Sequence, residues 1–271
     1  MNEALQNLSG IGPVTLEKVA EVEAAMLAMN LPQADCPLTH HFAPGVCVRQ
    51  VLMPAGHICI GHAHKFADLN IMLTGRLTLL MDDGTLKELK APQTFLGQPG
   101  RKIAFIHEDV LWQNVWPTEL RDVEAVENHF LDKSPAWVAD NQQRLALEKL
   151  NHAGDREDFE RWLAELGLTT AMVLAHPVAA VEPGLGGCNF QVAESPIAGM
   201  GVFATTAIDA GDIIAARGLD TFSLLARYMN HSPNPNVRAE GNELVALRRI
   251  AGCRGGQRGE ELTVNYRELK F

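Results

Sequence analysis

The chain lacks the features that mark secreted, disulfide-rich and membrane proteins. Its five cysteines are an odd number and include no Cys-x-x-Cys pair, which argues against a disulfide framework and a cysteine zinc site and fits a reducing compartment. No apolar run reaches membrane-spanning length, and the first residues show no basic region followed by an apolar core. We therefore expect a cytoplasmic protein with no membrane partner.

An excess of basic residues is also missing. The net charge is −10, with 24 acidic and 14 basic side chains in residues 1–187 and nine of each in residues 188–271. This balance argues against nucleic acid as a main partner. Tyrosine is scarce as well, because Tyr228 and Tyr266 are the only two in the sequence.

The 271 residues, of which 46% are hydrophobic, are enough for two packed domains. An Ala-rich run with Gly12-Pro13 before it and Pro32 after it predicts a helix over residues 15–29. From residue 43 to 117 the pattern changes to short β-rich runs separated by turn residues, with no helical pattern between them. Six to eight closely spaced strands predict an all-β barrel or sandwich.

A helical section follows from residue 118 to 187. Ser134-Pro135 begins one helix with a capping residue and a proline in the first turn, and a second helix runs from near Asp155 to Gly167. The Gly- and Pro-rich residues 183–187 then mark a boundary. The predicted segments are a helix and lead-in, a β-barrel, a helical connector and a C-terminal domain: 1–42, 43–117, 118–187 and 188–271.

The β-rich segment contains a histidine pattern of the kind that binds metal. The spacing is Gly56-x5-His62-x-His64-x3-Asp68-x6-Gly75. Histidines at i and i+2 on a strand share one face, and imidazole with carboxylate suits a divalent metal. This spacing resembles the first motif of the cupins, with Asp68 where that family usually has Glu.

The second cupin motif is poor, because Ile103 occupies the position of the third histidine and His107 lies four residues further on. The resulting hypothesis is a divalent-metal site formed by His62, His64, Asp68 and His107. The alternative is a cupin-like barrel that has lost its metal and keeps these histidines as structural polar groups.

Three segments carry the C-terminal assignment. They are Gly199-Met200-Gly201-Val202-Phe203, then Arg227-Tyr228-Met229-Asn230-His231-Ser232-Pro233-Asn234-Pro235-Asn236, then Glu260-Glu261-Leu262-Thr263-Val264-Asn265-Tyr266. In this order they resemble the SET-domain protein methyltransferases. The resemblance implies a minimal SET-like β-fold with a pseudoknot, and a lysine methyl transfer toward which the Tyr266 hydroxyl is directed. It also implies that S-adenosylmethionine contacts Gly199, Met200, Gly201, Arg227, Asn230, His231 and Tyr266.

The sequence departs from that family in three places. Only 14 residues separate Asp212 from Arg227, where family members usually carry a larger insert that forms one wall of the peptide groove. The chain ends five residues after Tyr266, without a cysteine-rich zinc segment, and Val264 stands where many members have an aromatic residue. The missing wall would have to come from the helical section, the barrel or a second subunit.

The fold class expected from these patterns is mainly β with a helical connector. The function expected is an S-adenosylmethionine-dependent protein-lysine N-methyltransferase, acting on a protein substrate, with the barrel serving dimerisation or substrate capture in a homodimer. Two alternatives stay open. One is a catalytically silent S-adenosylmethionine-binding or assembly protein, and the other is a metal-dependent cupin enzyme with an accessory SET-like domain.

Overall fold

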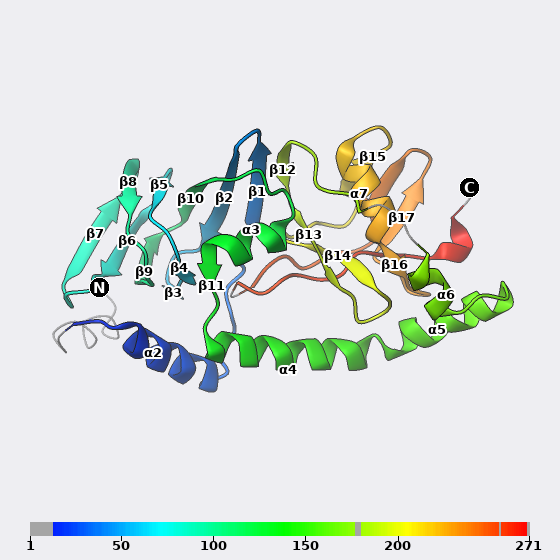
Figure 1. The fold of residues 1–271 in the computed structure, drawn as a ribbon, viewed down its shortest axis with the longest axis horizontal. Helices are drawn as coiled ribbons and strands as arrows, with labels where there is room; N and C mark the ends of the chain where they lie inside the picture. The colour runs from blue at the N-terminus through cyan, green and yellow to red at the C-terminus, as the bar shows by residue number, and fades with distance from the viewer. Residues whose placement is uncertain (1–12, 177–179, 255, 270–271) are drawn as a thin grey trace.

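A computed structural model describes residues 13–176, 180–254 and 256–269. A β-rich half and a C-terminal half lie side by side, and the long helix α4 (Pro135–Asn151) runs beneath both (Figure 1). In the described part of the chain, no helix combines the length and apolar character needed to cross a membrane.

The first half consists of two antiparallel sheets. The larger sheet has the order β12-β1-β2-β10-β5-β8 and the smaller has the order β3-β9-β6-β7. The strands of the larger sheet are β1 (Leu38–Ala43), β2 (Val46–Met53), β5 (Asp68–Met72), β8 (Gln93–Gly97), β10 (Val110–Pro117) and β12 (Gly186–Cys188). Those of the smaller sheet are β3 (Ile58–Ile60), β6 (Arg76–Leu80), β7 (Leu86–Lys90) and β9 (Ile103–Glu108).

The pairing of these strands is nested. Strand β2 pairs with β10, β3 with β9, β5 with β8 and β6 with β7, all antiparallel. This is the order of a jelly roll, the arrangement that cupins share with other two-sheet proteins. The predicted all-β barrel is therefore confirmed. Gly75 makes the turn between β5 and β6 at φ 87°, where a Cβ atom would lie 2.4 Å from the Asp109 carbonyl oxygen.

Two boundaries of the barrel differ from the prediction. Strand β1 begins at Leu38, ahead of the predicted start at residue 43, and pairs with β2 along its whole length. Gly186 and Gly187, the last two residues of the predicted boundary 183–187, form strand β12 together with Cys188, which pairs with His40 of β1. Glycine has low strand propensity. We therefore attribute this edge strand to its pairing with the free edge of β1 and not to its own sequence.

The three predicted helices are present as α2 (Leu16–Ala28), α4 and α5 (Ala153–Glu165). The structure adds α3 (Val123–Phe130) and α6 (Thr170–Ala175). The side chains of Thr15 and Ser134 accept backbone N–H groups at the starts of α2 and α4, as their sequences indicate. Strand β11 (Leu131–Asp132) follows α3 and pairs with β4 (Ala63–His64).

The C-terminal half is made of short strands around one helix. Its elements are β13 (Phe190–Glu194), β14 (Met200–Ala204), β15 (Ile213–Ala216), α7 (Asp220–Tyr228), β16 (Asn230–His231), β17 (Val237–Glu240), β18 (Glu243–Ala246), β19 (Thr263–Val264) and the 3-10 turn η1 (Tyr266–Glu268). Strands β13 and β14 form a hairpin, β15-β18-β17 form a sheet, and β16 and β19 pair in parallel.

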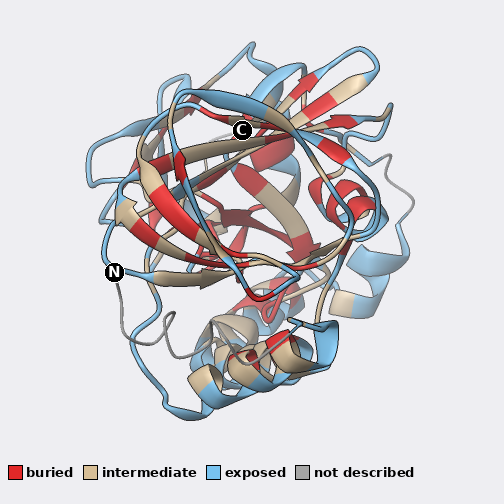
Figure 2. Cartoon of the chain, turned by 90° about the vertical axis from the view of Figure 1, so that its left-hand side faces the viewer, coloured by how far each residue is buried: buried red, intermediate tan, exposed pale blue. Residues whose placement is uncertain are grey.

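The two halves share one hydrophobic core. Phe42 and Trp116 of the barrel belong to the same buried cluster as Phe190, Val202 and Leu225 of the C-terminal half. Backbone hydrogen bonds also join the halves, because the Cys36 N–H donates to Cys253 and the Leu38 N–H donates to Thr205. Buried residues accordingly line the inside of the barrel and continue into the elements behind it (Figure 2).

Candidate functional site

The three C-terminal segments singled out in the sequence meet at one place. Asn230 and His231 in β16 pair in parallel with Thr263 and Val264 in β19. The residues just before β19 run along the β13–β14 hairpin, where the Leu262 N–H donates to the Val202 carbonyl oxygen at 2.8 Å. The last segment therefore lies between the hairpin and β16 and contacts both.

Asn230 ties these segments together through its side chain. Its Nδ2 donates to the Met200 carbonyl oxygen at 3.2 Å and to Glu261 Oε1 at 2.8 Å. The Ser195 hydroxyl donates to the same carboxylate at 2.8 Å. Burial raises the pKa of Glu261, while the hydrogen bonds from Asn230 and Ser195 act in the opposite direction. Glu261 is thus the shared acceptor of a buried polar cluster, and it was not identified from the sequence.

The glycines of this region are close to protein atoms. A Cβ atom on Gly201 would lie 2.2 Å from Glu261 Oε1, and one on Gly199 would lie 2.7 Å from Leu174 Cδ2. Gly199 also has a φ of 53°, which favours glycine. The space that these glycines leave open is taken up by Glu261 and by helix α6, while Met200 between them is 47% exposed.

His231 is completely buried, and its hydrogen bonds define its tautomer. The Tyr266 backbone N–H donates to His231 Nδ1 at 3.1 Å, so this nitrogen carries the lone pair. The proton is therefore on Nε2, which lies 2.8 Å from Asp158 Oδ2 and donates to it. Arg267 donates to the same carboxylate oxygen.

The Tyr266 side chain is held from two directions. Its hydroxyl donates to the Met229 carbonyl oxygen at 2.7 Å, and burial raises its pKa to about 12. Its ring meets Trp162 at a centroid distance of 5.3 Å and Phe159 at 6.1 Å. The tyrosine is therefore protonated at neutral pH, with its hydroxyl fixed against a backbone carbonyl.

Helix α5 contributes carboxylates that the sequence analysis did not assign to the site. Asp158 accepts from His231, and Asp155 Oδ1 accepts from the Ser232 hydroxyl at 2.6 Å. Asp155, Asp158, Phe159 and Trp162 have the spacing i, i+3, i+4, i+7, which places them on one helix face. The sequence did contain a signal for these partners: two aspartates interrupt the apolar stripe of the helix, and a buried apolar stripe normally contains no charged residue.

Arg227 lies in the last turn of α7 and is exposed. Its guanidinium carbon is 5.3 Å from the centre of the Tyr228 ring, and its charge lowers the pKa of Tyr266 against the larger effect of burial. Arg227 therefore lies near the cluster without entering its buried part.

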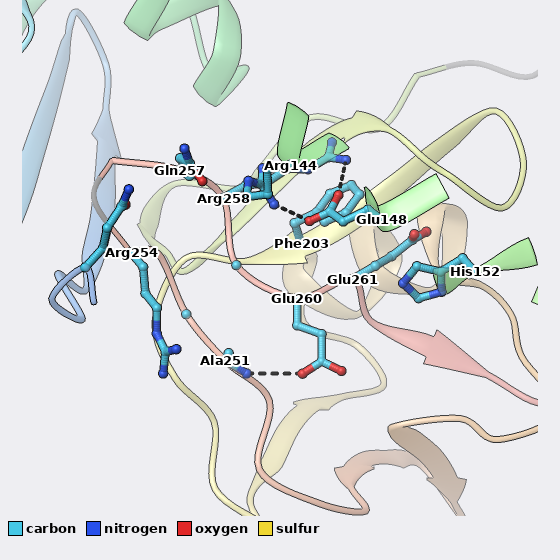
Figure 3. Close-up of a pocket in the computed structure, with 13 residues that line it drawn as sticks. Arg144, Glu148, His152, Phe203, Ala251, Arg254, Gln257, Arg258, Glu260 and Glu261 are labelled. Carbon is cyan, nitrogen blue, oxygen red and sulfur yellow. Dashed lines mark hydrogen bonds and ion pairs between the residues drawn. The ribbon is translucent and has the colours of Figure 1, made fainter. Parts of the chain in front are cut away.

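A pocket of about 400 Å³, which Glu261 helps to line, lies between α4 and the C-terminal half (Figure 3). Arg258 stacks on Phe203, 3.6 Å from the ring centre, and donates to Glu148 at 3.1 Å. Arg144 also pairs with Glu148. Among the charges that line this pocket, Arg144, Glu148 and Arg258 pair with one another. Glu260 and Arg254 pair with residues outside the lining.

The structure does not assemble the predicted metal set. His64 Nδ1 lies 3.1 Å from Asp68 Oδ2, but the His62 ring packs edge-on against Trp137 with centroids 5.0 Å apart. His107 lies on the smaller sheet, where its Nε2 is 2.8 Å from the Thr78 hydroxyl. Among the described residues, no group of three or more His, Cys, Asp or Glu side chains is placed to hold a metal ion. The hypothesis of a site made of these four residues was wrong in its geometry.

Asp68 is instead part of a paired polar network inside the barrel. It accepts from Trp116 Nε1 at 3.1 Å and from Asn114 Nδ2 at 3.2 Å. Burial opposes ionisation of Asp68, but hydrogen bonds from His64, Trp116 and Asn70 outweigh burial and hold its pKa below the ordinary value. The carboxylate is therefore satisfied by protein donors, and metal binding would have to displace them.

Comparisons with known proteins bear mainly on the barrel. No protein-family model and no curated protein matches this chain. Similar solved structures include a cupin-2 domain protein from Shewanella frigidimarina, with 11% identity and a TM-score of 0.26 over 35% of this chain and 91% of that one. A cupin domain from Bordetella pertussis shows 15% identity and a TM-score of 0.27 over 32% and 98% of the two chains.

Ectoine synthase from P. lautus also matches, with 9% identity and a TM-score of 0.30 over 40% of this chain and 85% of that chain. Scores this low carry no argument about activity. The cupin-like character of the first half rests on its nested strand pairing.

Proposed function

We propose that this protein is an S-adenosylmethionine-dependent methyltransferase that acts on a lysine side chain of another protein. The observation that carries the proposal is the meeting of three segments that are far apart in the sequence. The Asn230 side chain donates to the Met200 carbonyl and to Glu261, and the Tyr266 hydroxyl donates to the carbonyl of Met229, the residue before Asn230. Their sequence motifs resemble those of SET-domain enzymes, and their contact in space is what such a site requires.

Two kinds of group in this cluster support the assignment of this cofactor. Bound S-adenosylmethionine supplies an electrophilic methyl group on a positively charged sulfur, which a neutral lysine amine can attack. Aromatic faces and backbone carbonyl oxygens stabilise a positive charge. The Trp162 ring lies against those of His231 and Tyr266, and the Tyr266 hydroxyl donates to the Met229 carbonyl. Arg227, Met200 and the backbone of β16 would hold the rest of the cofactor.

Tyr266 is the proposed catalytic residue. Burial raises its pKa to about 12, so it stays a neutral hydrogen-bonding group even in moderately alkaline solution. Its hydroxyl and the Met229 carbonyl would orient the reacting groups, which is a large part of catalysis for an in-line transfer. The incoming lysine must be neutral before attack, and it would give its ammonium proton to solvent water before it enters the site.

The barrel has a different proposed role. The carboxylate of Asp68 inside the barrel accepts hydrogen bonds from protein groups and is not free to bind a metal. We therefore assign the barrel to subunit pairing or substrate capture. A metal-dependent reaction in the barrel lacks a supporting ligand cluster among the described residues.

Calorimetry tests the cofactor assignment. The purified protein is titrated with S-adenosylmethionine and separately with its demethylated product. Saturable binding of either compound, weakened in an Asn230→Ala variant, is the expected result. The absence of binding for both compounds overturns the proposal. Binding without methyl transfer to any protein would instead identify a catalytically silent S-adenosylmethionine-binding protein.

A further inference from the structure

Helix α5 precedes the C-terminal domain in the chain but contacts the centre of its candidate site. Asp155, Asp158, Phe159 and Trp162 all reach β16 or the residues that flank it. The contacts are directional as well as apolar, since both aspartates accept hydrogen bonds from the Asn-His-Ser motif. A helix that only braced two domains would not need two partly buried carboxylates at this point.

Asp158 acts on Tyr266 through His231. By accepting the His231 Nε2 proton at 2.8 Å, it favours the tautomer in which Nδ1 has a free lone pair. That lone pair accepts the Tyr266 backbone N–H at 3.1 Å. The same carboxylate also receives Arg267, the next residue in the chain after Tyr266. Asp158 therefore fixes the backbone of the proposed catalytic tyrosine by two routes.

Trp162 closes the aromatic side of the site. Its ring lies nearly parallel to that of His231, with an interplanar angle of 20° and centroids 6.1 Å apart, and it meets Tyr266 edge-on. The side chain is only half-buried, so one part of the ring faces away from the cluster. A half-exposed tryptophan beside buried aromatic rings is suited to contact a planar or cationic ligand.

We propose that α5 forms one wall of the cofactor site, with Asp158 as a positioning residue that acts through His231 and Trp162 as a ligand-contacting residue. This inference rests on the proposed function. It means that the cofactor site is complete only when the helical connector is docked on the C-terminal domain. The ligand class is a nucleoside carrying a sulfonium, which presents a planar base and a positive charge.

The test compares Asp158→Ala, Asp158→Asn and Glu160→Ala. Glu160 is exposed on the same helix, so its variant removes one carboxylate without touching the site. We expect Asp158→Ala to weaken S-adenosylmethionine binding about tenfold or more, since a charge-assisted hydrogen bond is lost. Asp158→Asn keeps an acceptor for His231 Nε2 and should restore part of the affinity. Glu160→Ala should stay within about twofold of the parent protein.

A second readout separates positioning from general destabilisation. Nitrogen-15 NMR of histidine-labelled protein without ligand reports the His231 tautomer, which should be Nε2–H in the parent protein and in Asp158→Asn but mixed in Asp158→Ala. Trp162→Phe should remove most of the tryptophan fluorescence change that accompanies S-adenosylmethionine binding, while Trp112→Phe in the barrel should keep it.

The outcomes distinguish the two claims. If the parent protein binds S-adenosylmethionine but Asp158→Ala behaves like Glu160→Ala in affinity and tautomer, this inference is overturned and the proposed function stands. If the parent protein does not bind the compound, the proposed function fails, and the role of α5 in a cofactor site fails with it. The NMR result then still decides whether Asp158 sets the His231 tautomer.

Discussion

Tyr266 shows how much of the site depends on single hydrogen bonds. Its hydroxyl and its backbone N–H each have one defined partner, Met229 and His231. The sequence could point to Tyr266, Asn230 and His231 because the motif that contains them is local. It could not show that Asp158 accepts from His231 or that Glu261 accepts from Asn230, because these pairs are far apart in the sequence and have no regular spacing.

The first prediction concerns the Tyr266 hydroxyl. Tyr266→Phe should lower the rate of methyl transfer by on the order of a hundredfold, because a positioned polar group is lost from the reacting centre. Cofactor affinity should change little, since the ring and its aromatic contacts stay. Single-turnover assays with labelled cofactor, together with calorimetry, measure the two effects separately.

Tyr228→Phe is the matched control for that experiment. The Tyr228 hydroxyl accepts the Val181 N–H at 3.1 Å, outside the proposed site. Its removal should lower the free energy of unfolding by about 1 kcal/mol and leave the transfer rate of the folded protein unchanged. Equal rates for Tyr266→Phe and the parent protein would refute the catalytic role of Tyr266.

Helix α5 is the element whose position matters most to the site. The sequence predicted its span well, because its end at Gly167 and its apolar residues are local signals, and Gly167 does have a positive φ of 72°. Where the helix docks could not be predicted, since docking depends on a surface formed by residues far along the chain. The metal hypothesis failed for a related reason. Strand periodicity predicts which face of a strand carries His62, His64 and His107, but it does not predict which sheet each residue lies on or how close together they are.

The second prediction addresses the stability of α5. Gly154 lies in its first turn, and a Cβ atom there would have no neighbour within 4 Å. Gly154→Ala should therefore raise the free energy of unfolding by about 0.5–1 kcal/mol through helix propensity alone. Urea unfolding followed by circular dichroism measures the change. A decrease in stability would show that α5 is not helical at this position.

The two halves of the molecule share a core, so whole-molecule stability is sensitive to groups at their junction. His40 is fully buried, and neither ring nitrogen has a hydrogen-bond partner; Glu127 is 3.6 Å away. Burial lowers the pKa of His40 and of His62 to about 4. These side chains are neutral in the folded protein near neutral pH.

The third prediction follows from these two histidines. An unfolded histidine titrates near pH 6.5, so between about pH 6.5 and 4 the unfolded chain binds protons that the folded protein does not. Stability should therefore fall as the pH is lowered through this range, by roughly 1.4 kcal/mol per pH unit for each histidine. Urea unfolding at a series of pH values measures the slope.

Variants assign that slope to its source. His40→Gln removes one of the two groups and should flatten the pH dependence, whatever its effect on absolute stability. His57→Gln changes an exposed side chain and should leave the slope as it is. A slope that is unaffected by His40→Gln would contradict the account.

The fourth prediction concerns the association of subunits. Leu69 and Leu96 lie opposite each other in the larger sheet and are 41% and 63% exposed, so the outer face of this sheet carries apolar surface. We predict a homodimer that buries this face. Light scattering should give twice the chain mass of 29.6 kDa, and Leu96→Lys should shift the protein toward the monomer. A parent protein that is monomeric at all concentrations would exclude this pairing.

Methyl transfer to lysine can be detected directly by isotopic labelling. The purified protein is incubated with host lysate and S-adenosylmethionine carrying an isotopically labelled methyl group, and the proteins are analysed by mass spectrometry. We expect a labelled methyl group on a lysine of at least one lysate protein, and we expect this labelling to disappear when the Tyr266→Phe variant is used. No labelled lysine above the level of a sample without the protein would contradict it.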